Sequence, residues 1–298
     1  MNEQEAIDLY TAALRHLGIG RGDIVYLAVD MARLPLPAYP AKLNREAIRA
    51  REQRWCAFVL ERLQETIGPE GTLIAPTFFY SYARSNGPYI HEESPSETGP
   101  FTEYFRTLPE ARRSLHPIYS VAAIGPLASE IADGIVGKSA FGAMSVFGRL
   151  TRYPIKFLFL GASVGESLTH AHHLEHMYGC NHRYHMVFNT PVSMGGHEIP
   201  GPWLCFMRYL GTPVRADVFP LERRLRERGV LVEWPDWPHP MQMVTIEDAE
   251  RIGYEMLAEA PWSFTREPVE IHMESPGKAP HPALQTAVRF HPDPEERP

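Results

Sequence analysis

Four short apolar runs, each bordered by turn residues, recur along the chain up to residue 161. They are DIVYLAV at 23–29, TLIA at 72–75, YSVAAIG at 119–125 and IKFLFLG at 155–161. Bounded apolar runs of this length are typical of buried β-strands. Segments with helical spacing separate them, and this alternation predicts an α/β fold whose strands are covered on both faces. We therefore expect a three-layer α/β/α sandwich with a mostly buried central sheet.

Helical periodicity predicts four helices outside these strands, at residues 5–17, 44–66, 217–228 and 245–260. The sequence after residue 183 instead alternates between apolar and polar positions and contains the turn pair Gly195-Gly196, which indicates a β-hairpin. The sandwich is therefore expected to carry a C-terminal extension built from a β-hairpin and helices.

No internal repeat and no linker divides the chain before its C-terminal end, so we predict a single domain over residues 1–265. The last 30 residues contain six prolines and little apolar periodicity. Residues 266–298 are accordingly expected to form a loosely packed, proline-rich tail. The composition, 44% hydrophobic and 22% charged residues, is that of an ordinary globular domain.

Charge and terminal sequence limit the kinds of partner. The net charge is −7 with no basic cluster, which argues against a nucleic-acid partner. No apolar run reaches the roughly 18 to 20 residues that span a bilayer, and the acidic N-terminal sequence lacks the features of a signal peptide. We expect no membrane partner and a cytoplasmic location. Three scattered cysteines, Cys56, Cys180 and Cys205, indicate reduced thiols rather than a disulfide framework.

The most informative segment is THAHHLEH at 169–176, which follows the last predicted strand and a glycine-containing turn. A helix is expected to begin near Ser167, at a strand end of the kind where α/β proteins bind ligands. Residues 172–176 match H-x-x-E-H, a zinc-hydrolase motif with two metal ligands and a general base. A zinc site would need His172, His176 and a third ligand such as Glu247 or Glu250.

Two other readings of this segment need no metal. His172 and Glu175 lie three residues apart, so their side chains are neighbours on a helix. A carboxylate bound to one imidazole nitrogen fixes the tautomer and raises the basicity of the other nitrogen, which makes a general base for an amine or hydroxyl. The remaining reading is a polar helix surface without chemistry.

Four collinear blocks carry a resemblance to a known family. They are GPEGTLIAPTFFYS at 68–81, FTEYFRTLPEARRSLHPIYSVAAIGPLA at 101–128, FGAMSVFGRL at 141–150 and THAHHLEH at 169–176. Together they resemble the aminoglycoside 3-N-acetyltransferases, over about residues 5 to 265. The family's T-x-x-H-x-x-E pattern is matched by Thr169, His172 and Glu175. The resemblance implies that His172 deprotonates the acceptor amine, that Glu175 orients it, and that acetyl-CoA, without a metal, is the co-substrate.

The resemblance also implies contacts to the two substrates. Thr77, Ser120 and the backbone amide of Val121 lie in blocks that approach coenzyme A and its thioester in the family, and Ser114 and Ser145 are assigned with them. The alternative for the hydroxyls is a structural role, capping turns and strand ends. On the acceptor side we assign Asp30 and Tyr80.

The chain departs from the family after its first strand. Family members carry His-Ser-Ser there, whereas this chain has Ala28, Val29 and Asp30. A carboxylate facing the pyrophosphate of coenzyme A would repel it by about 1 kcal/mol or more, so we expect Asp30 to pair with an ammonium of the acceptor. The following stretch, residues 32–53, is longer than in the family and is expected to reshape the acceptor pocket.

The leading hypothesis is therefore an acetyl-CoA-dependent N-acetyltransferase for a small-molecule amino sugar. A nucleotide-linked amino sugar is the alternative acceptor, with the arginine-rich residues 215–229 as a candidate diphosphate site or, more simply, an exposed amphipathic helix. A zinc hydrolase and a non-catalytic binding protein on a degenerate scaffold are the alternatives from other classes. The identity of the acceptor and the oligomeric state, a homodimer included, stay open.

Overall fold

A seven-stranded mixed sheet forms the centre of the computed structural model, which describes residues 1–39, 44–85, 87–134, 137–209 and 214–268. The order of its strands is β11-β12-β6-β1-β2-β5-β4. Their bounds are β1 Ile24–Val29, β2 Thr72–Pro76, β4 Arg112–Arg113, β5 Val121–Ile124, β6 Ile155–Leu160, β11 Val232–Glu233 and β12 Met241–Thr245. The four strands predicted from apolar runs are all members of this sheet.

The three central strands are parallel and determine where a site can form. β1 pairs in parallel with both β6 and β2, with Val25 opposite Lys156 on one side and Leu73 on the other. The outer pairings, β12 with β6 and β5 with β2, are antiparallel. The carboxyl ends of β6, β1 and β2 therefore meet at one edge of the sheet, where open α/β sheets bind ligands.

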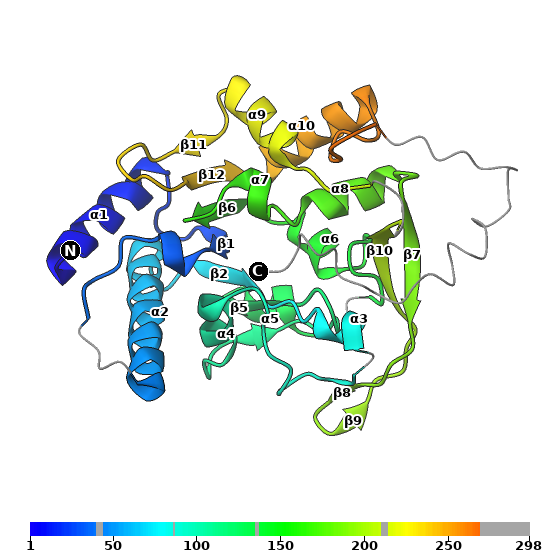
Figure 1. Ribbon diagram of the computed structural model, residues 1–298, viewed down its shortest axis with the longest axis horizontal. Helices are drawn as coiled ribbons and strands as arrows, with labels where there is room; N and C mark the ends of the chain where they lie inside the picture. Colours follow the sequence, from blue (N-terminus) through cyan, green and yellow to red (C-terminus); the bar gives the residue numbers. More distant parts are fainter. Residues whose placement is uncertain (40–43, 86, 135–136, 210–213, 269–298) are drawn as a thin grey trace, which may run out of the picture.

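Helices cover both faces of the sheet, which confirms the three-layer sandwich (Figure 1). One layer contains α1 Glu3–His16, α2 Arg45–Ile67 and α4 Pro100–Arg106; the other contains α5 Ala128–Ala132, α6 Val146–Leu150, α8 Ala171–Tyr178, α9 Phe219–Glu227 and α10 Ile246–Glu259. Successive residues of a strand point to opposite faces, so Val25 and Leu27 pack under the first layer while Tyr26 packs under the second.

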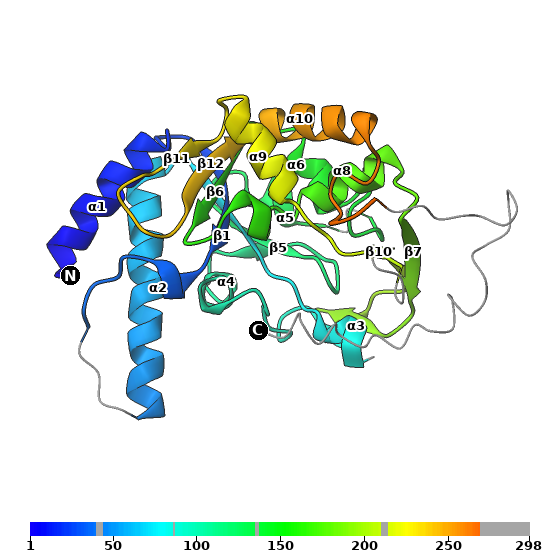
Figure 2. The ribbon, with the colours of Figure 1, turned by 45° about the horizontal axis from the view of Figure 1, so that its top comes forward.

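The predicted β-hairpin region forms a small outlying β-structure. β7 Arg183–Phe188 pairs antiparallel with β10 Trp203–Arg208, and between them β8 Val192–Met194 and β9 His197–Glu198 turn back through Gly195-Gly196. β3 Tyr89–Ile90 joins β8 in parallel. β7 and β10 stand at the end of the molecule opposite α1 and α2 (Figure 2). The hairpin is confirmed, with β7 and β10 as its long strands. The Gly195-Gly196 turn joins β8 to β9 and so does not connect the two long strands directly.

The helix expected to begin near Ser167 begins at Ala171, and a separate short helix, α7, ends at Ser167. Ser163 caps α7, Val164–Ser167, through a capping box with Glu166. Leu168 then leaves helical geometry, and α8 begins only at Ala171. Thr169 therefore lies in the turn before α8 and not one helical turn behind His172, as its spacing had suggested. Two further short elements, η1 Met31–Arg33 and α3 Ser81–Ser85, had no helical periodicity to predict them.

The predicted tail lies almost wholly outside the described residues, since 269–298 are not among them. Within the described part of the chain, no helix combines the length and apolarity needed to cross a membrane.

Candidate active site

A pocket of about 750 Å³ opens at the carboxyl ends of the parallel strands. The ends of β1, β2 and β6 and the segments after them supply most of its lining, with further residues from the stretch 97–102 and from α2. The lining residues are Ala28, Val29, Asp30, Met31, Ala32, Arg33, Glu52, Trp55, Pro76, Phe78, Tyr80, Glu97, Thr98, Gly99, Pro100, Thr102, Ala162, Glu166, Ser167 and Thr169. Gly161 allows the chains after β1 and β6 to come together, because a Cβ at this position would lie 2.6 Å from the carbonyl oxygen of Asp30. The strand-end location inferred from sequence is thus where the structure has a cavity large enough for a small molecule.

The pocket carries an excess of negative charge. Four carboxylates line it, against a single guanidinium from Arg33. Arg33 forms ion pairs with Asp30 and with Glu166, and no cationic partner is found for the other two carboxylates among the described residues. These two are Glu52, from the lengthened segment after β1, and Glu97. A pocket of this kind favours a cationic ligand.

Asp30 and Tyr80, both assigned to the acceptor, line this pocket, as does Thr169. Both carboxylate oxygens of Asp30 already have partners, because Oδ1 accepts from the amide of Ala32 at 3.0 Å and Oδ2 lies 3.2 Å from Arg33 Nε. The long segment after β1, residues 32–53, contributes Ala32, Arg33 and Glu52 to the lining of this pocket.

The predicted dyad forms in the structure. His172 Nδ1 lies 2.8 Å from Glu175 Oε2, and the carboxylate is completely buried, whereas the imidazole is 23% exposed. A buried carboxylate accepting from Nδ1 holds the proton on that nitrogen and leaves Nε2 with its lone pair. This is the arrangement that a general base requires.

Two residues that the sequence did not reveal complete the surroundings of Glu175. His182 Nε2 lies 2.9 Å from Glu175 Oε1, and Arg183 Nε lies 2.8 Å from Oε2. Both follow a chain reversal at Gly179, whose left-handed backbone ends α8. Despite burial, the positive charge of Arg183 and the hydrogen bonds from the two histidines hold the pKa of Glu175 well below its usual range. The carboxylate is therefore ionised under all ordinary conditions.

The pKa of His172 is lowered from its ordinary value. Burial of the ring is the main cause, and the positive charge of Arg183 is the second, with Arg183 Nη2 only 3.1 Å from Nδ1. The hydrogen bond to Glu175 opposes both effects without cancelling them. His172 is consequently neutral at neutral pH, with a lone pair available to accept a proton.

His172 itself lies beside the pocket and does not line it. Its backbone N–H donates to the carbonyl of Thr169, which does line the pocket. Phe141 packs edge-on against the imidazole, at 5.5 Å between ring centroids, and Tyr119 links Phe141 to Tyr80 on the pocket wall. A series of aromatic contacts thus connects the imidazole of His172 with the pocket wall at Tyr80.

The residues assigned to coenzyme A are buried and already hydrogen bonded to protein. Thr77 Oγ1 lies 2.9 Å from Ser120 Oγ, and Arg113 donates both to Ser120 Oγ and to the carbonyl of Thr77. To contact a thioester, Thr77 and Ser120 would have to exchange these bonds for bonds to the ligand. Their assignment to coenzyme A stays a prediction.

Ser114, Val121 and Ser145 are engaged in the same way. The amide of Val121 donates to Ser114 Oγ at 2.9 Å, and Ser145 caps α6 by accepting from the amide of Gly148. Ser114 and Ser145 both line a cavity of about 10 Å³, which is roughly the volume needed for one water molecule. Both hydroxyls thus have the structural role considered above, as partners of backbone amides. The contact of Ser114, Val121 and Ser145 with coenzyme A also stays a prediction.

The H-x-x-E-H match does not assemble as a metal site. Both oxygens of Glu175 are taken by His172, His182 and Arg183. His176 packs against the rings of His185 and Phe206 instead of pointing to a shared centre with His172. Within the described residues, the metal-type side chains that do converge are His170, His173 and Glu250.

Comparison with known proteins places the chain among antibiotic acetyltransferases. A sequence model described as aminoglycoside 3-N-acetyltransferase matches residues 49–233. Aminoglycoside N(3)-acetyltransferase VIII of Streptomyces fradiae is 26% identical over 204 residues, which cover 62% of this chain and 66% of that relative. The chain therefore spans about two thirds of the length of this curated relative.

Solved structures share the fold at lower identity. Sisomicin-bound AAC-VIa superposes with a TM-score of 0.69 and 21% identity, covering 87% of this chain and 98% of that one. AAC-IIIb in a binary complex with CoASH has a TM-score of 0.69 and 18% identity, covering 90% of this chain and 98% of that one.

Proposed function

This chain belongs to the aminoglycoside 3-N-acetyltransferase family, and on that premise we propose that it transfers an acetyl group from acetyl-CoA to an amino group of an amino sugar. Members of the family are acyl-CoA-dependent amine acyltransferases. The observation that carries the proposal is the hydrogen-bonded pair formed by His172 and the buried Glu175, three residues along the chain from Thr169, which lines an acidic pocket.

The dyad supplies the step that such a reaction needs. A protonated amine cannot attack a thioester, so a base must remove its proton. His172 is neutral and Nδ1 is held by Glu175, so Nε2 takes the proton as the amine nitrogen bonds to the thioester carbon. The carbon–sulfur bond then breaks, coenzyme A leaves as the thiolate, and the proton on Nε2 can pass to that sulfur. Glu175 stays ionised and stabilises the imidazolium formed in between.

The charge of the pocket supports a cationic acceptor. Amino sugars of the aminoglycoside type carry several ammonium groups, and the pocket presents Asp30, Glu52, Glu97 and Glu166 to them. We propose that the pocket carboxylates pair with ammonium groups of the acceptor other than the reacting one. The reacting amine must lose its proton and therefore is not held by a carboxylate. A polyanion such as coenzyme A is disfavoured in this pocket, so we propose that it approaches His172 from another side. Sisomicin and CoASH, bound by the relatives of known structure, are the first ligands to try.

The alternative acceptor, a nucleotide-linked amino sugar, gains little from the structure. Three of the five arginines in the segment proposed to hold its diphosphate are engaged with carboxylates: Arg224 with Glu259, Arg226 with Glu222 and Glu233, and Arg228 with Glu255. A diphosphate would have to displace these partners. The exposed amphipathic helix is the better description of this segment.

A thiol-release assay tests the proposal. Acetyl-CoA is offered with sisomicin, with free amino sugars and with nucleotide-linked amino sugars, and mass spectrometry identifies the acetylated product. We expect acceptor-dependent thiol release with the polycationic compounds, and its loss in His172→Ala. Acetyl-CoA binding by calorimetry without release against any of the amines would favour the non-catalytic binding protein instead.

A further inference from the structure

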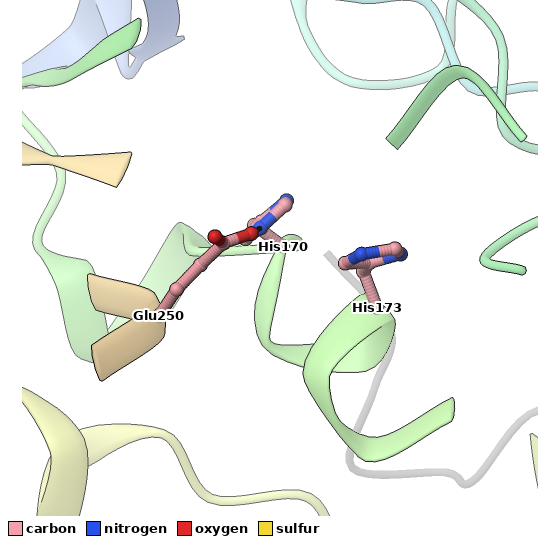
Figure 3. A group of neighbouring side chains, drawn as sticks. All are labelled: His170, His173 and Glu250. Carbon is pink, nitrogen blue, oxygen red and sulfur yellow. Dashed lines mark hydrogen bonds and ion pairs between the residues drawn. The ribbon is translucent and has the colours of Figure 1, made fainter. Parts of the chain in front are cut away.

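A second histidine cluster lies on the opposite side of α8 from the dyad chemistry and has no role in the proposed reaction. His170 and His173 flank the start of α8, and Glu250 reaches them from α10 (Figure 3). One ligand-type atom from each of the three lies within 4.8 Å of the others. Two imidazoles and one carboxylate are a ligand set that divalent zinc accepts.

His173 is oriented as a metal-binding histidine is. Its Nδ1 donates to the carbonyl oxygen of Phe141 at 2.7 Å, which places the proton on that nitrogen and leaves Nε2 with the lone pair. Among the described residues no hydrogen-bond partner of Nε2 is found. A backbone carbonyl on the far nitrogen is a usual outer partner of a metal-ligating imidazole, because it fixes the tautomer and ring direction.

His170 is incompletely satisfied by the protein alone. Its Nε2 lies 2.9 Å from Glu250 Oε1, while its Nδ1 is buried and has no partner in the described part of the chain. A buried ring nitrogen without a partner costs about 1–3 kcal/mol, so the site lacks one interaction. The described part of the protein therefore does not satisfy both nitrogens of this ring.

The packing of α8 against α10 holds the three side chains together, and the partly exposed Glu250 gives an ion access to them. Gly253 of α10 lets the helices approach closely, since a Cβ there would lie 2.5 Å from Leu174 of α8. Phe157 packs beside His170, with ring centroids 5.3 Å apart, and low polarity strengthens the attraction between a cation and its ligands. The Glu250 side chain is 25% exposed, so an ion and a water ligand can enter from this side.

We propose that His170, His173 and Glu250 bind a divalent transition-metal ion, zinc in the first place, as a structural clamp between α8 and α10. Ligand atoms about 2.0–2.2 Å from zinc lie about 3.3 Å apart in a tetrahedron. The side chains must therefore draw in by up to about 1.5 Å from a 4.8 Å separation, which rotamer adjustment can supply. The fourth ligand is water. This site goes beyond the proposed acetyl transfer, which takes place at His172 and uses no metal.

The test is a titration of metal-stripped, full-length protein with zinc chloride, followed by calorimetry and by the melting temperature. Cobalt(II) is a second probe, since a four-coordinate site gives it visible absorption. We expect one equivalent to bind and the melting temperature to rise. His173→Ala should weaken zinc binding by about 100-fold and Glu250→Gln by about tenfold. Glu250→Gln is nearly isosteric, so it reports on binding even if His173→Ala folds poorly.

His176→Ala is the matched control, because His176 lies on the same helix outside the cluster. It should bind zinc as the unaltered protein does. Absence of a stoichiometric site at micromolar zinc would overturn the proposal, and so would full binding by Glu250→Gln. Loss of binding in His176→Ala would overturn it by moving the metal to the H-x-x-E-H residues. The acetyltransferase proposal is tested separately, by the thiol-release assay on the metal-free protein, and absence of acceptor-dependent thiol release there would contradict it.

Discussion

His182 Nε2 lies 2.9 Å from Glu175 Oε1, so the carboxylate that orients His172 is itself oriented by a second histidine seven residues further on. Arg183 holds the same carboxylate at 2.8 Å. Glu175 is fully buried and cannot turn without breaking one of these contacts. The base is thus supported by a chain of interactions that begins in the loop after α8.

We predict that His182 is a positioning residue for this dyad. A hydrogen bond to a charged group contributes about 1.5–3 kcal/mol. If its loss raises the activation free energy by about half of that amount, the reaction slows about tenfold. His182→Ala should therefore lower kcat about tenfold without changing the KM for acetyl-CoA. His182→Gln, which can place an amide donor where Nε2 lies, should recover most of the rate. Equal losses in both variants, or a change confined to KM, would count against positioning.

The central prediction is that His172 is the general base. Removing a positioned base costs about 10² to 10⁴ in rate, so His172→Ala should lose that much kcat and still bind acetyl-CoA in calorimetry. Glu175→Gln should lose less, because the imidazole remains. The double variant should be scarcely slower than His172→Ala, since residues acting as a unit are not additive.

Two controls accompany this prediction. Glu175→Gln leaves the buried guanidinium of Arg183 without its counter-charge, which can cost about 3–5 kcal/mol of stability, so its kinetics are measured well below its melting temperature. His176→Ala removes a neighbouring histidine that contacts only His185 and Phe206 among the ring contacts of the described residues. A loss in His176→Ala as large as that in His172→Ala would show that the base is misassigned.

Asp30 is predicted to help bind the cationic acceptor. Its side chain is 40% exposed, and pairs involving exposed carboxylates contribute up to about 1 kcal/mol. Asp30→Asn should therefore raise the acceptor KM about two- to fivefold while leaving acetyl-CoA affinity unchanged. Glu110→Gln, at an exposed carboxylate outside the pocket, is the matched control and should change neither constant. A change in acetyl-CoA affinity alone would place Asp30 on the donor side.

Stability is predicted to fall in mild acid because of His116. Its Nδ1 accepts from the amides of Ile118 and Tyr119, and Nε2 donates to Leu204 O. Burial lowers the pKa of His116 from 6.5 to about 4. Between these pH values His116 is protonated in the unfolded chain and neutral in the native protein. The free energy of unfolding therefore decreases as pH falls through this window. The full effect is about 3 kcal/mol, measured by urea unfolding at pH 7 and pH 4.5.

The variant that checks this assignment is His116→Asn. Its side-chain oxygen can accept the same two amide hydrogens, but it does not titrate. It should be less stable at pH 7 and should lose less stability on acidification. Burial also lowers the pKa values of His173 and His176 to about 4, so these two residues account for the pH dependence of the free energy of unfolding that remains in the variant. An unchanged slope would mean that His116 is not the group that titrates.

Local sequence was enough for the sandwich and for the pairing of His172 with Glu175, whereas the choice of this pair over a zinc site came from the family resemblance. The strands β1, β2, β5 and β6 are short buried runs whose composition allows little else, and three-residue spacing on a helix brings His172 to Glu175 wherever that helix lies. The edge of the sheet at which a site could form follows from the parallel order of such strands. Asp30 was placed on the acceptor side because it stands where the family has a hydroxyl, and both Asp30 and Tyr80 line the pocket.

Tertiary structure alone decided which of many similar side chains take part. Among fourteen histidines, only packing selects His182 for Glu175 and His170 and His173 for Glu250, because α10 lies about eighty residues away along the chain. It also decided that Thr77 and Ser120 bond to each other and to Arg113, and that Glu52 and Glu97 add their charges to Asp30 in one pocket. Hydrogen bonds and electrostatic fields depend on distances of a few ångströms between residues remote in sequence, and no local pattern contains those distances.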